Sequence, residues 1–338
     1  MMPVAGQRIL LIGIGFYDYE AAIAAEFRAL GAEVRVENEQ PPELRGWLAP
    51  LRRRVKSDDG AATSRHLHAM RERARTIGKL DHVVVIKGTR LDEAFLRGLR
   101  ADNPGVRLTA YHWDSMARFP ELLRRQALFD RVLTFDHADA AANPDFVLRP
   151  LFFRPELAVP ASATTIDISF VGWLHHDRLR QVEQVRAQAD TLRLTSDFYL
   201  STGGWTATKL RLKRRGQGVH SRAQPFDRYV ATSLASRGIL DLPHPQQTGL
   251  TMRAIEAIGA GRKLITTGVD IRRYDFYQPE NIAIIDPVVP QLDPAFLGAP
   301  MALVDPAIIE RYSLRGWALD VLGVTEPTSF MRDPLPTT

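Results

Sequence analysis

The chain has 338 residues, of which 45% are apolar and 25% charged, and its formal net charge at pH 7 is +5. This composition is typical of a soluble globular protein, and the length allows two domains, each with its own core. The absence of cysteine excludes a disulfide framework, thiolate catalysis and cysteine metal sites. The apolar run over residues 9–14 is too short for a signal peptide or a membrane span, so we expect a cytoplasmic protein.

The positive charge is concentrated in two short runs. They are Arg52 to Arg54 with Lys56, and Lys209 with Arg211, Lys213, Arg214 and Arg215. Such runs attract anions. Three partners are expected as alternatives: the anionic inner face of the cytoplasmic membrane, a phosphate-bearing acceptor, or a donor diphosphate. A solvated helix face is a fourth interpretation. Neither run is interleaved with aromatic residues, so nucleic acid is not an expected partner.

Strands and helices are expected to alternate in the first half of the chain. Periodicity and glycine positions predict a strand over 8–14, a helix over 18–30, strands over 32–37 and 82–86, helices over 64–77 and 91–100, and strands over 107–111, 131–135 and 146–151. Residues 41–60 are rich in proline and arginine and are expected to be a mobile surface segment. The first strand ends in a GxG pattern, which is weak evidence for a dinucleotide site because the third glycine is missing.

The second half repeats the alternation after a proline-bearing linker over 154–160. The expected strands are 166–171, 192–200, 238–242, 263–267 and 281–285, and the expected helices are 178–189, 206–215, 226–236 and a pair over 308–322 that is interrupted near Ser313. The aromatic residues of 271–277 are expected to pack inside this domain. Alternation on both sides of a linker predicts two doubly wound α/β domains.

The stretch from Gly238 to Thr267 carries the strongest pattern of the chain. Its expected order is strand, loop, helix, strand, because an apolar run is followed by prolines and then by a helix that two glycines end. Thr248 is expected to cap this helix, and Gly249 allows a ligand to approach the backbone. We expect the loop to lie at the carboxyl edge of a sheet.

A phosphate site is expected where this helix begins. The amides of Gly249, Leu250 and Thr251 are expected to be free, and together with the positive end of the helix dipole they suit a phosphate or a diphosphate. A helical wheel puts Arg253 and Glu256 on an uncovered face. Glu256 lies about 10 Å further along the axis, where a carboxylate would accept hydrogen bonds from two ribose hydroxyls. The alternative is a surface pair of Arg253 and Glu256 without a ligand.

This stretch resembles a known family. The segment HPQQTGLTMRAIEAIGAGRKLITT, followed by RRYDFYQPENIAIID over 272–286, is similar to bacterial lipopolysaccharide and capsular polysaccharide biosynthesis proteins, which look like glycosyltransferases of the GT-B type. The resemblance extends through FYDYE at 16–20, VIKG at 85–88, YHWDS at 111–115, LTFDHAD at 133–139 and ISFVGWLHHDR at 168–178. It implies a GT-B-like α/β fold of two Rossmann-like domains facing a central cleft, and sugar transfer from a nucleotide sugar to a saccharide or lipid-linked acceptor.

The resemblance also implies domain boundaries and a role for each part of the chain. Residues 1–155 would form the acceptor-side domain, 161–305 the nucleotide-sugar domain, 306–324 helices that return to the first domain, and 325–338 a disordered tail. GT-B transferases generally work without a bound metal, so we expect no metal and no cofactor besides the nucleotide sugar, which is a co-substrate. Asp136 and Asp139 resemble an FD..D element of the family; a metal pair and helix capping are the alternatives for them.

Transfer with inversion needs a general base near the acceptor hydroxyl. Asp114 is the preferred base, because it follows a strand end beside Trp113, which can stack on a sugar; capping of the next helix is the alternative for Asp114. His112 and Asp18 are the other candidates for the base, and capping is again the alternative for Asp18. The expected acceptor contacts are Tyr17, Tyr19, Lys87, Gly88 and Trp113.

The donor contacts are expected from three segments of the second half. They comprise His175, Arg178, Lys209, Gln247, Thr248, Gly249, Leu250, Thr251, Arg253 and Glu256. A histidine and an arginine at a glycine turn suit a leaving diphosphate. Two other functions share the fold: a catalytically silent nucleotide-sugar-binding partner of a polysaccharide assembly complex, and a nucleotide-sugar epimerase or hydrolase.

Overall fold

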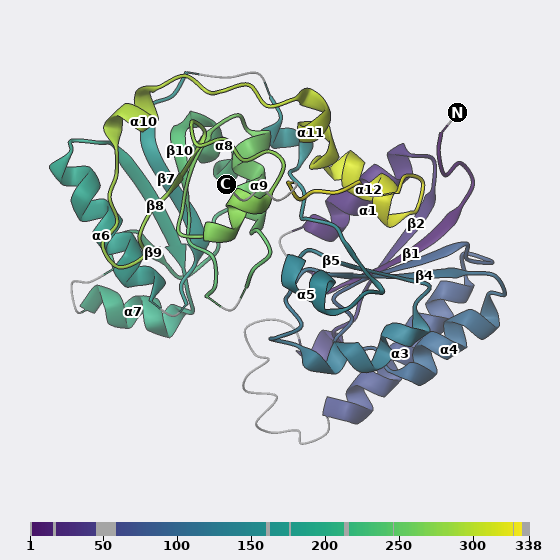
Figure 1. The fold of residues 1–338 in the computed structure, drawn as a ribbon. Coiled ribbons are helices and arrows are strands. Elements are labelled where there is room, and N and C mark those ends of the chain that lie inside the picture. Colours follow the sequence, from purple (N-terminus) through teal and green to yellow (C-terminus); the bar gives the residue numbers. More distant parts are fainter. Residues whose placement is uncertain are drawn as a thin grey trace. The chain divides into compact units, whose positions relative to one another are not determined.

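The computed structural model describes residues 2–15, 18–44, 59–159, 163–175, 177–212, 216–245, 247–326 and 328–332 (Figure 1). The chain divides into two compact units. Unit 1 comprises Met1–Pro150, Gln246–Gly249 and Leu314–Thr328, and unit 2 comprises Leu151–Pro245, Leu250–Ser313 and Ser329–Thr338. Most of the segment predicted to be mobile, residues 45–58, lies outside the described residues, as do Tyr17 and residues 213–215 of the second basic run.

Unit 1 is built on a six-stranded parallel sheet with the strand order β2-β1-β3-β4-β5-β6. The strands are β1 (Arg8–Gly13), β2 (Glu33–Asn38), β3 (His82–Ile86), β4 (Arg107–His112), β5 (Arg131–Thr134) and β6 (Phe146–Leu148). The order reverses between β1 and β3, which makes the carboxyl ends of these two strands the topological switch point. All five residues of β3 are buried, as expected for a central parallel strand covered on both faces.

Helices cover both faces of this sheet (Figure 1). They are α1 (Tyr19–Ala29), α3 (Asp59–Arg75), α4 (Glu93–Asp102), α5 (His137–Ala142) and α12 (Leu314–Val321), with short 3-10 helices η1 (Pro42–Leu44) and η2 (Pro120–Leu128). The late helix α12 lies against α1, and its fully buried Trp317 meets the ring of Tyr111 edge-on at 5.0 Å. Arg149 is fully buried and pairs with Asp320 of α12 at 2.7 Å, so a buried ion pair also attaches this helix to the unit.

Unit 2 has a second six-stranded parallel sheet, with the order β12-β11-β10-β7-β8-β9. The strands are β7 (Ile166–Trp173), β8 (Ser196–Ser201), β9 (Val219–His220), β10 (Ser236–Asp241), β11 (Lys263–Thr266) and β12 (Ile282–Ile284). The helices are α6 (Arg178–Thr191), α7 (Gly204–Leu212), α8 (Phe226–Ala235), α9 (Met252–Gly259), α10 (Pro294–Gly298), α11 (Pro306–Arg311), and the 3-10 helices η3 (Pro155–Leu157) and η4 (Val269–Arg273). Here the switch point lies between β7 and β10.

The predicted fold class, two doubly wound α/β parts, is confirmed. The break predicted near Ser313 is present, because α11 ends at Arg311 and α12 begins at Leu314. Two predictions at the end of the chain need correction. Residues 306–313 group with unit 2, so the return to the first unit begins at Leu314. The described part of the tail is ordered, since Phe330 is 1% exposed and packs against the ring of Tyr312.

Candidate functional site

Two residues at the carboxyl edge of the unit 1 sheet have unusual backbone conformations. Lys87, directly after β3, has a φ of 72°, and Asp18, before α1, has a φ of 59°. Non-glycine residues in this left-handed region carry strain that is concentrated at functional sites. Asp18 is exposed and makes no side-chain hydrogen bond that caps α1, so the capping explanation for Asp18 is wrong. Both strained residues follow the strands that flank the switch point.

Asp114 lies at the same edge, after β4, and is held by two cations. One carboxylate oxygen is 2.8 Å from Nζ of Lys87, and the other accepts a hydrogen bond from Arg118 at 2.8 Å. The ammonium of Lys87 also lies 4.1 Å from the ring centre of Phe119, the N-cap residue of η2. Asp114 therefore does not cap this helix. Its carboxylate is 17% exposed, and each of its oxygens contacts one cation.

The other predicted residues of this edge differ in access. His112 is 4% exposed, and burial, with repulsion from Arg125, lowers its pKa to about 4, which makes it a weak base at neutral pH. Gly88 has a φ of 74° and Trp113 is half-buried, while Tyr19 is 7% exposed. The geometry therefore favours Asp114 and Asp18 over His112 as a group that meets a substrate.

The glycine turn after β1 already holds an anion. The carboxylate of Glu20 accepts hydrogen bonds from the amides of Ile14 and Gly15 at 2.9 and 2.8 Å. A Cβ atom on Gly13 would lie 2.4 Å from Cγ of Glu20, so glycine is needed there to admit this side chain. The amides that bind a pyrophosphate in dinucleotide-binding folds are thus occupied by the chain itself.

A second internal carboxylate occupies the loop before α9. Asp136 is 1% exposed and caps α5, where it accepts a hydrogen bond from the amide of Ala138 at 3.0 Å. Within unit 1 it also accepts hydrogen bonds from the amides of Thr248 and Gly249 at 3.1 and 3.2 Å, and from the hydroxyl of Thr248. The prediction that Thr248 caps the helix and that the amide of Gly249 is free is therefore wrong. The oxygen of Thr248 is used by Asp136 instead.

The residue three positions after Asp136 also has a local role. Asp139 accepts a hydrogen bond from the amide of Met116 at 2.8 Å. Burial raises the pKa of Asp139 to about 6, and the negative charge of Asp136 acts in the same direction against the Met116 hydrogen bond. Among the described residues, no three histidine or acidic side chains are grouped so that they could hold a metal ion. In the FD..D element, Asp136 therefore caps a helix and Asp139 binds a backbone amide of another segment.

The switch point of unit 2 brings together residues from two separate strands. His175 follows β7 and His244 follows β10, and their ring centres lie 5.6 Å apart. Open α/β sheets bind ligands at this place, outside the carboxyl ends of the diverging strands. Of the two rings, the sequence predicted only that of His175. His244 was not predicted, because the prolines on either side of it were interpreted only as residues that end the strand.

Two guanidinium groups lie beneath this switch point, and one of them pairs with a carboxylate. Arg253 of α9 pairs with Asp241, the last residue of β10, at 2.8 Å, and donates to the carbonyl of Val171 at 2.9 Å. Arg178 donates to the carbonyls of Trp173, at 2.8 Å, and Leu242. Burial, with repulsion from Arg253, lowers the pKa of Arg178 to about 9 despite the attraction of Asp241. The group holds more positive than negative charge.

The structure corrects the predicted face of α9. Glu256 is 2% exposed, and its carboxylate accepts a hydrogen bond from the hydroxyl of Tyr229 on α8. Arg253 is also largely buried and pairs with Asp241. The helical wheel represented the periodicity of α9, but periodicity could not show that α8 covers the side of α9 that carries Glu256. The actual cap is Thr251, whose hydroxyl accepts from the amide of Ala254 at 3.1 Å and donates to Asp241 at 2.8 Å.

The remaining predicted donor residues have other surroundings. Gln247 donates to the carbonyl of Gly249 at 3.0 Å, and Leu250 is 7% exposed. Lys209 is exposed on α7, 6.0 Å from the ring of Trp205. Asp241 was missed by the sequence analysis, although a single acid that ends an otherwise apolar strand was a usable signal.

Solved structures of other proteins resemble this chain in fold. No family model and no curated protein sequence matches the chain. A protein from Listeria monocytogenes assigned as a UDP-N-acetylglucosamine 2-epimerase aligns over 95% of this chain and 96% of its own, with a TM-score of 0.55 and 12% identity. The UDP-GlcNAc 2-epimerase of Methanocaldococcus jannaschii aligns over 94% and 99%, with a TM-score of 0.51 and 10% identity.

The chain has a GT-B-like fold. At 10 to 12% identity the similarity establishes the fold, and the reaction has to be argued from the site residues. No helix in the described parts of the chain combines the length and the apolar character needed to span a bilayer.

Proposed function

We propose that this GT-B-like protein is a glycosyltransferase that moves a sugar from a nucleotide-sugar donor to a saccharide or lipid-linked acceptor in bacterial lipopolysaccharide or capsule synthesis. The observation that carries the proposal is the surplus positive charge at the switch point of unit 2, where Asp241 pairs with Arg253 while Arg178 donates to backbone carbonyls. Two guanidinium groups with one carboxylate suit a ligand that brings negative charge, and a leaving diphosphate does so. His175 and His244 border the same place.

The proposed donor set keeps all ten sequence-predicted residues, with altered roles for some. Arg178 and Arg253 would act on the diphosphate as buried charges, and Thr251 would hold the start of α9 in place. Glu256 would meet a ribose only after it exchanges its hydrogen bond with Tyr229. Gln247 and Leu250 would contribute backbone groups, and Lys209 would reach the donor from α7. The amides of Thr248 and Gly249 would contribute only after Asp136 releases them.

The proposed chemistry on unit 1 is an inverting displacement. The acceptor oxygen forms a bond to the anomeric carbon of the donor sugar, the bond from that carbon to the diphosphate breaks, and the acceptor proton passes to Asp114. Lys87 and Arg118 hold the carboxylate in place until the acceptor replaces one of them. Gly88, Trp113, Tyr17 and Tyr19 would line the acceptor path. The buried cations of unit 2 would take the role of a metal at the leaving group, so the proposed reaction needs none.

Nucleotide binding is the first test. Calorimetric titration with uridine, guanosine, cytidine and adenosine diphosphates should find one that binds, and His175→Gln should weaken that binding. The matched control is His68→Gln, because His68 is exposed on α3 in unit 1. A well-folded protein that binds none of the four would contradict the proposed donor site.

Turnover separates the proposed reaction from the alternatives on the same fold. The corresponding nucleotide sugar is incubated with and without a mixture of saccharide acceptors, and the products are followed by NMR. Release of nucleoside diphosphate that depends on an acceptor supports glycosyl transfer. Inversion at a sugar carbon without diphosphate release would identify an epimerase, release without an acceptor a hydrolase, and binding without any change a silent partner.

Contact with an anionic membrane is part of the proposal, together with a cytoplasmic location. Three exposed side chains of α7 support it: Trp205 and Leu212 are 76% and 81% exposed, and Lys209 is exposed between them. Aromatic and aliphatic side chains beside basic residues suit the surface of an anionic bilayer. The protein should sediment with phosphatidylglycerol vesicles and not with phosphatidylcholine vesicles. Trp205→Ser should reduce this binding, and Val269→Ser, at another site exposed on unit 2, should not.

A further inference from the structure

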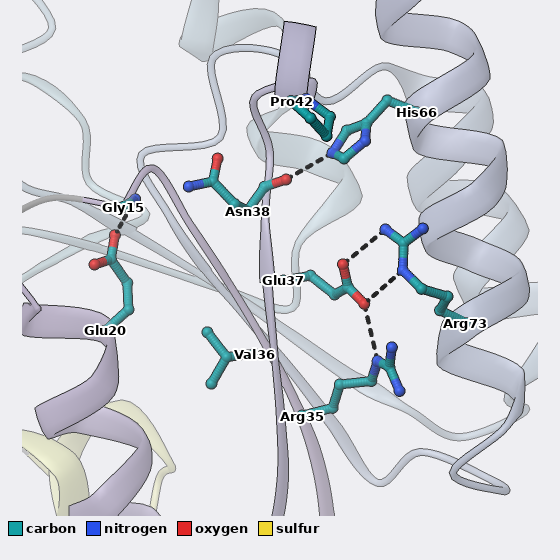
Figure 2. Close-up of a pocket in the computed structure, with 9 residues that line it drawn as sticks. All are labelled: Gly15, Glu20, Arg35, Val36, Glu37, Asn38, Pro42, His66 and Arg73. Carbon is teal, nitrogen blue, oxygen red and sulfur yellow. Dashed lines mark hydrogen bonds and ion pairs between the residues drawn. The ribbon is translucent and has the colours of Figure 1, made fainter. Parts of the chain in front are cut away.

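A pocket that contains none of the residues assigned so far to the base, donor or acceptor lies within unit 1 (Figure 2). It encloses about 470 Å³ at the carboxyl ends of β1 and β2 and is bordered by α3. Its lining consists of Gly15, Glu20, Arg35, Val36, Glu37, Asn38, Pro42, His66 and Arg73. The volume is in the range of small-molecule sites, and it has room for a monosaccharide.

The centre of the lining is one carboxylate held by two guanidinium groups. Arg73 donates to Glu37 through Nε and Nη2 at 2.9 and 2.8 Å, and Arg35 donates through Nε at 2.9 Å. Burial favours a higher pKa of Glu37, but the hydrogen bonds from Arg73 and Arg35 outweigh it and lower the pKa. Glu37 is therefore ionised at neutral pH. With two cations for one anion, this wall of the pocket has a surplus positive charge.

The guanidinium groups keep donors for a ligand. Arg73 uses two of its three nitrogens for Glu37 and Arg35 uses one, and neither side chain has another hydrogen-bond acceptor among the described residues. Their side chains are 40% and 30% exposed. In Figure 2, Arg35 comes from β2 and Arg73 from α3, and one amino group of Arg73 and the amino groups of Arg35 are directed away from the Glu37 carboxylate. Planar guanidinium forks match the oxygens of a carboxylate or a phosphate.

The other acid of the lining is directed away from the two guanidinium groups, although its negative charge brings the formal charge of the whole lining to zero (Figure 2). Glu20 is 5% exposed and is directed to the amides of Ile14 and Gly15, so the backbone already satisfies it. The remaining walls suit a sugar ring. His66 and Asn38 bring polar groups, with Nε2 of His66 2.7 Å from the carbonyl oxygen of Asn38, while Val36, 41% exposed, and Pro42 add apolar surface.

We infer that this pocket binds the acidic group, a carboxylate or a phosphate, of a saccharide. Its place on the same sheet edge as Lys87 and Asp114 makes this saccharide part of the acceptor, an assignment that rests on the proposed function. The acceptor of the proposed transfer is then an anionic sugar, and Arg35 and Arg73 are the residues that select it. The affinity of the pocket for an anionic sugar does not depend on the transfer reaction.

The test is calorimetric titration of the full chain with three probes: glucuronate, glucose 1-phosphate and glucose. At low salt, at least one anionic probe should bind about tenfold or more tightly than glucose, the factor expected for one charge-assisted contact. The anion that binds more tightly tells whether the pocket takes a carboxylate or a phosphate. Equal binding of glucose and both anions, or no binding of any probe, would overturn the inference.

Three variants separate ligand contact from structural support. Arg35→Gln should weaken anion binding about tenfold, since it removes one of the two cations. Arg8→Gln is the matched control, because Arg8 also joins β1 to β2 through a glutamate, Glu33 at 3.2 Å, but lies outside the pocket. Glu37→Gln should tighten anion binding by removing the competing charge. If Glu37→Gln and Arg35→Gln weaken binding equally, or Arg8→Gln does so too, the pocket has only a structural role.

Nucleotide titration of the same variants tests the proposed function separately from this inference. Arg35→Gln should leave the affinity for a nucleoside diphosphate unchanged. Nucleotide binding without anionic-sugar binding would reject the pocket and leave the transferase proposal intact. Anionic-sugar binding without nucleotide binding would do the reverse.

Discussion

Asp136 accepts a hydrogen bond from the backbone amide of Thr248 at 3.1 Å, although 112 residues separate them in the chain. The same carboxylate caps α5, so a single buried acid fixes both a helix start and the loop that precedes α9. A diphosphate that used the amides of Thr248 and Gly249 would first have to displace this carboxylate.

Asp136→Asn should lower the free energy of unfolding by about 2 kcal/mol, because the charge is lost and the amide nitrogen of asparagine cannot accept the hydrogen bonds that one carboxylate oxygen now accepts. Asparagine remains a good helix cap, so the loss should be concentrated at the loop. Hydrogen exchange of the amides of Thr248 and Gly249 should accelerate, while that of Ala138 should change little. Asp145→Asn, at an exposed position, is the control. Equal acceleration at all three amides would contradict this role.

Asp139 should make stability depend on pH. Its pKa is about 6 in the folded protein and 3.8 in a model peptide, so between these values the folded state binds more protons than the unfolded state. The free energy of unfolding then falls as pH rises from about 4 to about 6. Asp139→Asn keeps an acceptor for Met116 and should be more stable than the parent at pH 8, by at most about 3 kcal/mol. Urea titrations that differ equally at pH 4 and pH 8 would refute this.

The ion pair between Arg149 and Asp320 should be costly to break from one side. Arg149→Met leaves a largely buried carboxylate without its partner and should cost about 3 to 5 kcal/mol. The double variant Arg149→Met with Asp320→Leu should cost clearly less, because neither charge remains. Chemical denaturation of the parent, both single variants and the double variant measures the coupling. Additive losses would mean that the two charges do not stabilise each other.

Asp114→Asn should reduce kcat of the proposed transfer by about 100-fold or more and leave the donor Kd unchanged, as expected for a general base. Asp18→Asn and His112→Gln are measured beside it, and each should have a smaller effect. A large loss for Asp18→Asn with near-normal turnover of Asp114→Asn would reassign the base to the strained residue before α1. Unchanged circular dichroism spectra are required of all three variants.

Much of the fold was predictable because it depends on local patterns. The strand His82–Ile86 was predicted to the residue, since five buried residues in a row suit a central parallel strand. The start of α9 was predicted at Thr248, yet the helix begins at Met252, because Asp136 from a distant segment engages Thr248. β9 has only two residues, too few for a periodic signal.

The site was less predictable because it depends on which elements cover which faces. Periodicity placed Glu256 opposite the apolar stripe of α9, but the hydroxyl of Tyr229 meets it there. Asp241 and His244 belong to the site only because of the strand order. This order places β10 next to β7, although more than sixty residues separate these strands in the chain. The pocket around Arg35, Glu37 and Arg73 joins a strand to a helix and has no sequence motif of its own.

The position of Glu20 in the glycine turn has a consequence for selectivity in the cell. Because this carboxylate is tethered to the turn, its effective concentration there is set by the fold, and a dissolved nucleotide phosphate has to compete with it for the amides of Ile14 and Gly15. Abundant dinucleotides and nucleoside triphosphates are therefore poor competitors at this edge of unit 1. The turn is thereby filled by a carboxylate of the chain itself, and the proposed acceptor would bind beside it.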